Sequence, residues 1–153
     1  MVTRARVTRE QAYQALFDTV KAITLPGSAA WGVRMRGIKS ADEVPPANQP
    51  ALFVAQGPER ASARRDRGAQ TWDWWAAIVV YFRTEPMPVA EDWTFANAVL
   101  ESLETILWNP DGVQTLGGVV ADCFIEGEVG LFPEPEQMQQ QTLVIPVVMI
   151  VGE

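Results

Sequence analysis

The segment QTWDWWAAIVVYFRT, residues 70–84, constrains the fold more than any other part of the chain. It is rich in β-branched and aromatic residues, which is typical of a β-strand. Side chains of a strand alternate between two faces. One face of this strand would be wholly apolar and would carry Trp72, Trp74, Ala76, Ile78, Val80 and Phe82. The other would be apolar in its middle and would carry Asp73, Trp75, Ala77, Val79, Tyr81 and Arg83.

A strand that is apolar on both faces needs cover on both faces. We expect Trp72 and Trp74 to lie in the core of the domain. The residues Trp75, Val79 and Tyr81 are predicted to face either a second layer of this chain or a neighbouring subunit, because tryptophan is a frequent interface anchor.

Two amphipathic helices are predicted, and they can cover one face of a sheet. Thr8 and Gln11 form a capping-box start, and apolar residues then recur at helical spacing until Leu25-Pro26-Gly27. A second helix follows residues 85–92, with Glu101 and Glu104 on its outer face. Its apolar face carries Val99, Leu100, Leu103, Ile106 and Leu107.

Further strands are predicted at residues 31–38, 51–56, 119–128 and 140–152. Pro146 lies inside the last of these, and because proline cannot donate to a strand ladder it predicts an edge or a bulge there. Residues 1–153 are therefore expected to form one α+β domain. Its mixed, mainly antiparallel sheet has about five strands, with two α-helices packed on one face.

The segment GPERASARRDRGA, residues 57–69, lies between two predicted strands and lacks any periodicity. We predict a mobile hairpin loop here, because long loops without structure of their own are usually functional or disordered. Its charged residues are candidates for docking a partner: Glu59, Arg60, Arg64, Arg65 and Arg67. The arginines could contact nucleic-acid phosphates or order on the acidic surface of a protein.

The charges are divided between the two halves of the chain. All twelve basic residues precede residue 84, and twelve of the nineteen acidic residues follow residue 83. One interpretation is that the second half exposes solvated carboxylates, which keep a protein soluble. The other is a polarised molecule that packs head-to-tail with copies of itself or lines a passage with negative charge.

Neither catalysis nor metal binding is predicted. The chain has no histidine, which removes the commonest general base and metal ligand. Its one cysteine, Cys123, is expected to be a buried and inert thiol that suits a reducing compartment. Asp122, Glu126 and Glu128 could approach a hard cation, but same-face positions on a strand are about 7 Å apart, which favours a solvated face or a charged interface.

Several segments together resemble the tail terminator (minor tail, gpU-like) proteins of long-tailed bacteriophages. They are QPALFVAQ at 49–56, IVVYFRT at 78–84, NAVLESLETIL at 97–107, QTLGGVVADCFIEGEV at 114–129 and the final QQTLVIPVVMIV. The similarity spans about residues 8–151. These are positional patterns and not a catalytic signature.

The resemblance implies an α+β structural protein without enzymatic activity or cofactor, located at the tail–neck junction of a virion and in the host cytoplasm before assembly. Such proteins form a hexameric ring on the tail tube, end its polymerisation and provide a surface for head attachment. The implied partners are further copies of the chain, the major tail tube protein, a head-completion or connector protein and the tape-measure protein. No membrane is involved, and DNA passes through the ring without specific binding.

An acidic wall around that passage would repel DNA phosphates, and the candidates for it, or for an acidic interface, are Glu126, Glu128, Glu134 and Glu136. Another neck component, such as a head–tail connector or tail-completion protein, is an alternative within the same class. A small-molecule or metal-binding α+β module is the alternative from a different class.

Overall fold

The computed structural model describes residues 7–25, 30–66, 69–83, 93–133 and 140–152. The elements, in chain order, are helix α1 (Arg9–Val20), strand β1 (Val33–Arg36), the 3₁₀ turns η1 (Ala41–Glu43) and η2 (Pro46–Asn48), strands β2 (Ala51–Asp66) and β3 (Ala69–Arg83), helix α2 (Trp93–Leu107), and strands β4 (Asp122–Ile125), β5 (Gly130–Pro133) and β6 (Gln140–Gly152).

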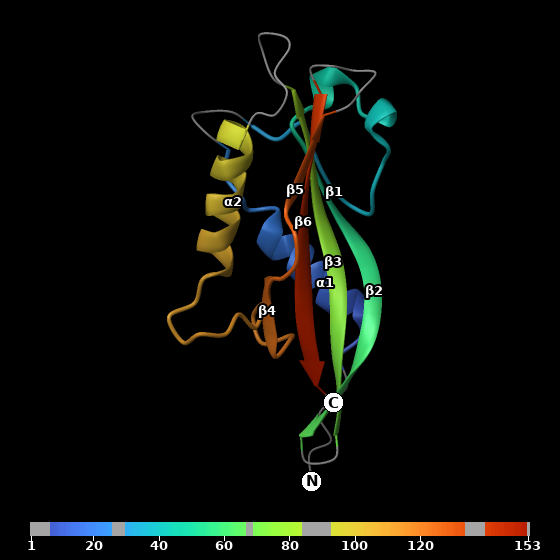
Figure 1. Cartoon of the computed structure of the whole chain (residues 1–153), viewed down its shortest axis with the longest axis vertical. Coiled ribbons are helices and arrows are strands. Elements are labelled where there is room, and N and C mark those ends of the chain that lie inside the picture. Colours follow the sequence, from blue (N-terminus) through green and yellow to red (C-terminus); the bar gives the residue numbers. More distant parts are fainter. Residues whose placement is uncertain (1–6, 26–29, 67–68, 84–92, 134–139, 153) are drawn as a thin grey trace.

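The strands form one sheet in the order β1-β2-β3-β6-β4, and β5 also pairs with β6 (Figure 1). The β1–β2 pair is parallel and the other pairs are antiparallel. The predicted α+β class is therefore confirmed. Strand β5 was not expected, because four residues with a terminal proline carry no clear period.

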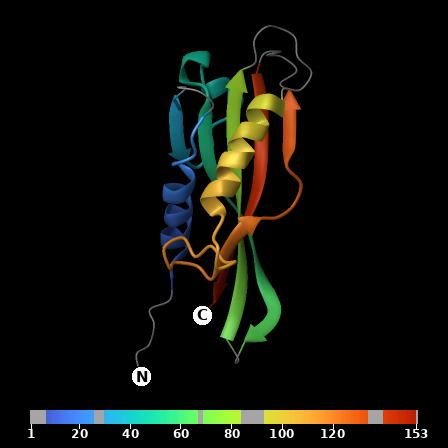
Figure 2. The ribbon, with the colours of Figure 1, turned by 90° about the vertical axis from the view of Figure 1, so that its left-hand side faces the viewer.

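Both helices pack on the same face of the sheet, which we call the helix face (Figure 2). Helix α1 begins with the predicted capping box of Thr8 and Gln11. Apolar residues of both helices meet the sheet in one core cluster, in which Leu16, Trp74 and Leu103 are fully buried. The assignment of Trp74 to the core is thus confirmed, and Trp72 packs against the same cluster while partly buried.

The connection between β2 and β3 is much shorter than predicted. Most of the segment 57–69 continues the two strands, and their pairing reaches Asp66 opposite Ala69. The ladder shifts register between Gln56 and Glu59 and again between Ala61 and Arg65. The first shift accommodates Gly57 and Pro58, which do not suit a regular strand. Backbone hydrogen bonds do not depend on side-chain type, so the pairing continues through residues that lack an apolar pattern.

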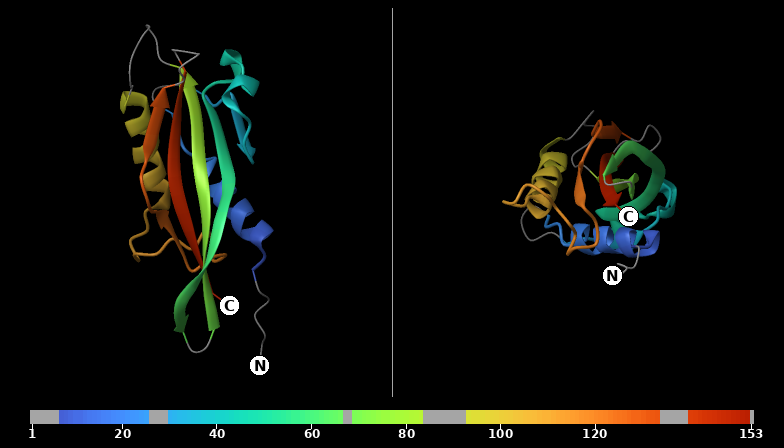
Figure 3. Two further views of the ribbon diagram at one scale, coloured as in Figure 1. Left: turned by 45° about the vertical axis from the view of Figure 1, so that its right-hand side comes forward. Right: turned by 90° about the horizontal axis from the view of Figure 1, so that it is seen from below.

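Gly57 is required at the first shift, since a Cβ there would lie 2.9 Å from the carbonyl oxygen of Trp75. Beyond Thr71, which pairs with Gly152 of β6, the hairpin consists of β2 and β3 alone. We call residues 59–66 and 69–73 the arm. Its outer part, residues 62–66 and 69–70, projects past the end of the sheet, whereas residues 71–73 still pair with β6 (Figure 3).

Strand β6 is not an edge strand, so the prediction from Pro146 is wrong in that respect. It lies between β3 and the two short strands β4 and β5. The Pro146 carbonyl accepts a hydrogen bond from Glu126 N, so its nitrogen faces the same side, where β4 has ended and β5 has not begun. The missing N–H therefore faces an interruption in the neighbouring strand and costs no ladder bond.

The face of the sheet away from the helices, which we call the far face, is covered in part by the chain itself. Ala41 and Val44 from the η1 segment pack over one end of β2 and β3, and Val33 and Met35 of the adjacent strand β1 pack beside them. Beneath them lie Phe53 and Tyr81, whose ring centroids are 5.5 Å apart. This small second cluster is the second layer that the apolar far face of β3 requires.

Candidate assembly surfaces

The described residues contain no cluster of three or more histidine, cysteine, aspartate or glutamate side chains that could hold a metal ion. Cys123 is buried on the helix face, as predicted. Burial raises the pKa of its thiol to about 12, with the nearby Asp122 adding to the shift, so the thiol stays protonated at neutral pH. No described helix is long and apolar enough to cross a membrane.

A cluster on the helix face holds the base of the arm. Arg9 of α1 forms a bidentate ion pair with Glu59, with Nε–Oε1 and Nη2–Oε2 distances of 2.5 and 2.7 Å. The same guanidinium lies 5.0 Å from the ring centroid of Trp74. The hydrogen bond with Glu59 raises the pKa of Arg9 above its usual value.

Tyr13 completes this cluster. Its ring stacks on Trp74, and its hydroxyl donates a 2.8 Å hydrogen bond to the carbonyl oxygen of Trp75. Burial, followed by the charge of Glu59, raises the pKa of Tyr13 to about 12. Helix α1 thereby fixes the direction in which the arm leaves the sheet. The sequence carried no signal for the Arg9–Glu59 pair, because fifty positions separate the two residues.

The predicted docking residues are found in different environments. Glu59 contacts α1, as described above, and is part of the fold. Arg60 is exposed and in register with Asp73, which places it on the far face. Arg64 and Arg65 belong to β2 within the arm, and Arg67 lies outside the described residues.

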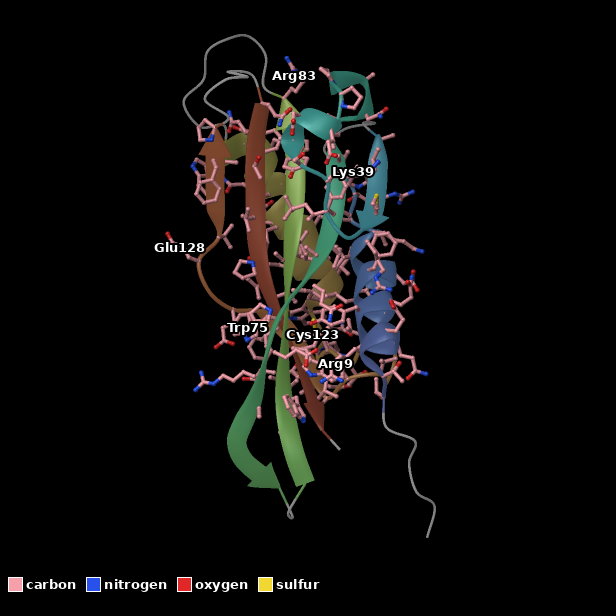
Figure 4. The ribbon with its side chains drawn as sticks, turned by 90° about the vertical axis from the view of Figure 1, so that its right-hand side faces the viewer. Arg9, Lys39, Trp75, Arg83, Cys123 and Glu128 are labelled. Atoms are coloured by element: carbon pink, nitrogen blue, oxygen red, sulfur yellow. The ribbon has the colours of Figure 1, made fainter. Side chains whose placement is uncertain are left out.

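The predicted interface residues also differ. Val79 and Tyr81 are 4% and 5% exposed, and they lie beneath the second cluster, so they have little surface for another subunit. The Tyr81 hydroxyl donates a hydrogen bond to the carbonyl oxygen of Lys39, within the same chain. Trp75 is partly exposed on the same face and keeps surface available for contact (Figure 4).

An apolar strip crosses the uncovered part of the far face. Phe124 of β4, Val148 of β6 and Trp75 of β3 are in register across three strands. Phe124 is 38% exposed, and Phe132 of β5, further along the same face, is 58% exposed. We call this surface the open strip, and it comprises Trp75, Phe124, Phe132, Val144, Pro146 and Ile150.

One residue in the sequence indicates the open strip. Phe124 is the one aromatic residue among the acidic residues Asp122, Glu126 and Glu128 on the polar parity of its predicted strand. A large aromatic side chain at such a position is typical of an interface core surrounded by a polar rim.

Acidic residues lie along the outer edge of the open strip. Glu126 and Glu128 are exposed in the connection between β4 and β5, and Glu128 lies at the opposite edge of the sheet from Lys39 (Figure 4). They follow β4 and do not belong to it, which corrects the predicted extent of that strand. Glu134 and Glu136 lie outside the described residues.

No protein-family model and no curated protein matches the sequence. Solved structures do match the fold. One is a chain from the virion of a native gene transfer agent (GTA) particle, with a TM-score of 0.54 and 12% sequence identity. The match covers 92% of this chain and 94% of that chain. At this identity, the similarity establishes the fold.

Proposed function

We propose that the protein is a structural component of a virion, and that it acts as a tail terminator. In this role it forms a ring, as a hexamer, at the end of the tail tube, where it stops polymerisation and presents a surface to a head-completion or connector protein. The observation that carries the proposal is the fold similarity to a virion chain over nearly the full length of both proteins. The residue patterns that resemble those of tail terminators favour this role among the possible roles of a virion protein.

The surfaces of the molecule are consistent with a role in assembly. An apolar strip remains open on the far face, whereas the cysteine is buried and protonated. An exposed apolar patch with a polar rim marks a protein–protein contact. In a ring, the strip of one copy would meet a different surface of the next, because heterologous contacts that close produce rings.

Deletion of the gene from the genome that produces the particles tests the tail-terminator role. We expect tails longer than normal and free of heads, because nothing stops the growing tube, and a plasmid copy of the gene should restore normal particles. Electron microscopy measures tail length and head attachment. Headless tails of normal length would instead identify a later joining step, and normal particles would refute a role in the virion.

A further inference from the structure

The outer side of helix α2 carries a stripe of exposed side chains with a tryptophan at each end. Its members recur at intervals of three or four positions and therefore share one side of the helix. We call them the α2 stripe, and they include Trp93, Asn97, Glu101, Glu104 and Trp108. Trp108 follows the last helical residue, but its N–H still donates a 2.8 Å hydrogen bond to the carbonyl oxygen of Glu104, so the helical direction continues to it.

The chain does not cover the α2 stripe. The residues of α2 that are buried in the core, Ala96, Val99 and Leu103, lie on the opposite side of the helix. No described helix or strand lies outside α2 (Figures 1 and 2). Trp108 is 70% exposed, more than any other large apolar side chain of the described residues. Because tryptophan is strongly enriched among the residues that dominate binding energy, this end of the stripe is a candidate contact.

The middle of the α2 stripe is acidic. Glu101 and Glu104 lie between the two tryptophans and form no ion pair with a described residue. Asp111, in the turn beyond Trp108, is exposed as well. Residues 93–133 contain no arginine or lysine that could neutralise these carboxylates. The stripe therefore presents negative charge flanked by aromatic surface, which complements a basic partner.

The basic residues of α1 and β1 offer little charge to such a stripe. Helix α1 lies beside α2, where Thr24 N donates a 3.1 Å hydrogen bond to Ser102 Oγ, but Lys21 at its end is paired with a carboxylate of α1. Arg9 and Arg36 are also paired with carboxylates of the same chain. This distribution favours a partner other than a copy of the chain.

We propose that the α2 stripe binds a different protein of the virion, through a surface that carries arginine or lysine between apolar side chains. The bases of that surface face Glu101 and Glu104. Trp108 packs on an apolar side chain or under an arginine, which stacks on indole rings. The carboxylates repel phosphates, so nucleic acid does not fit this surface. The proposal rests on the role in a virion proposed above, and it assigns the open strip and the α2 stripe to different partners.

Photocrosslinking in assembled particles tests which molecule occupies the stripe. Trp108→p-benzoylphenylalanine should crosslink to a different virion protein, at a segment in which basic residues outnumber acidic ones, and mass spectrometry identifies that segment. Phe124→p-benzoylphenylalanine is the matched control. It belongs to the open strip, so it should crosslink to a copy of this chain.

Charge reversal then measures the contact with the purified partner that the crosslink identifies. Glu101→Lys/Glu104→Lys should weaken binding about tenfold or more in calorimetry. Trp108→Thr should also weaken it. Self-association and melting of both variants should match those of the natural protein, because the changed side chains are exposed. Asp42→Lys alters an exposed carboxylate of η1, away from α2, and should bind the partner normally.

The proposal is overturned if Trp108→p-benzoylphenylalanine crosslinks to a copy of this chain, to DNA, to a segment without excess basic charge, or to nothing in complete particles. Normal binding by Glu101→Lys/Glu104→Lys would overturn it as well. Loss of self-association in that variant would show that a copy occupies the stripe. These outcomes are distinct from failure of the tail-terminator role, which the gene deletion tests by tail length.

Discussion

Two regions of the far face, one over β2 and β3 and the other over β4, β5 and β6, differ in how their apolar surface is covered. Near Tyr81, Ala41 and Val44 lie over β2 and β3, and Val33 and Met35 of the adjacent strand β1 complete the cluster around Phe53. Over β4, β5 and β6, no described segment lies above Phe124 and Phe132. The same sheet therefore has a closed region that stabilises the monomer and an open region whose apolar side chains remain exposed. Mutations in the two regions should separate folding from assembly.

The largest effect on stability is expected in the closed region. Phe53→Ala removes a fully buried ring from the second cluster, and large-to-small core changes of this kind cost about 3–5 kcal/mol. Urea denaturation measures the loss, and Phe53→Leu, which keeps most of the volume, should cost less than about 1.5 kcal/mol. A loss for Phe53→Ala as small as that for Phe53→Leu would show that the second cluster is not a packed layer.

Trp75 lies between the two regions, and its replacement should affect both properties. Trp75→Ala is expected to reduce the free energy of unfolding by about 1–2 kcal/mol, because the side chain is only partly buried. The backbone carbonyl that Tyr13 uses is retained. Self-association, measured by sedimentation, should fall further than stability does. If the variant simply unfolds, Trp75 belongs to the core.

The smallest effect on folding is expected in the open region. Phe124→Thr keeps a residue that favours strands and should change stability by less than about 1 kcal/mol. Self-association should still weaken, because the phenyl ring of Phe124 is a central part of the open strip. Trp108→Thr is the matched control: Trp108 is 70% exposed but lies outside the strip, so its loss should leave association unchanged. Equal effects of the two substitutions would argue against the strip.

The sequence predicted the parts of the molecule that follow local rules. The capping box at Thr8, the two helices and the burial of Trp74 follow from spacing and alternation, and all are found in the structure. The paired strands of the arm were missed because backbone ladders continue through polar residues when a facing strand is present. No local pattern could report that partner.

The candidate site was predictable only in part. Trp75 was identified as facing away from the main core, but Val79 and Tyr81 share its parity and are covered by a segment about forty residues earlier in the chain. Likewise, Glu59 and Arg60 are sequence neighbours on opposite faces, and only the strand register shows that one contacts α1 while the other is exposed. Such distinctions depend on long-range packing.

Pro146 has a consequence beyond its own strand. Pro146 has no N–H to donate, so one hydrogen bond that would join β4 and β5 into a continuous strand along β6 cannot form. The chain instead leaves the sheet after Glu126, and Gly127, at φ +115°, passes close over the proline ring before β5 begins at Gly130. Glu126 and Glu128 are carried outward by this detour. The missing N–H of Pro146 therefore coincides with the gap between β4 and β5 in which Glu126 and Glu128 lie. Replacing Pro146 with valine would restore a donor there and would allow the neighbouring chain to pair with β6 across the gap.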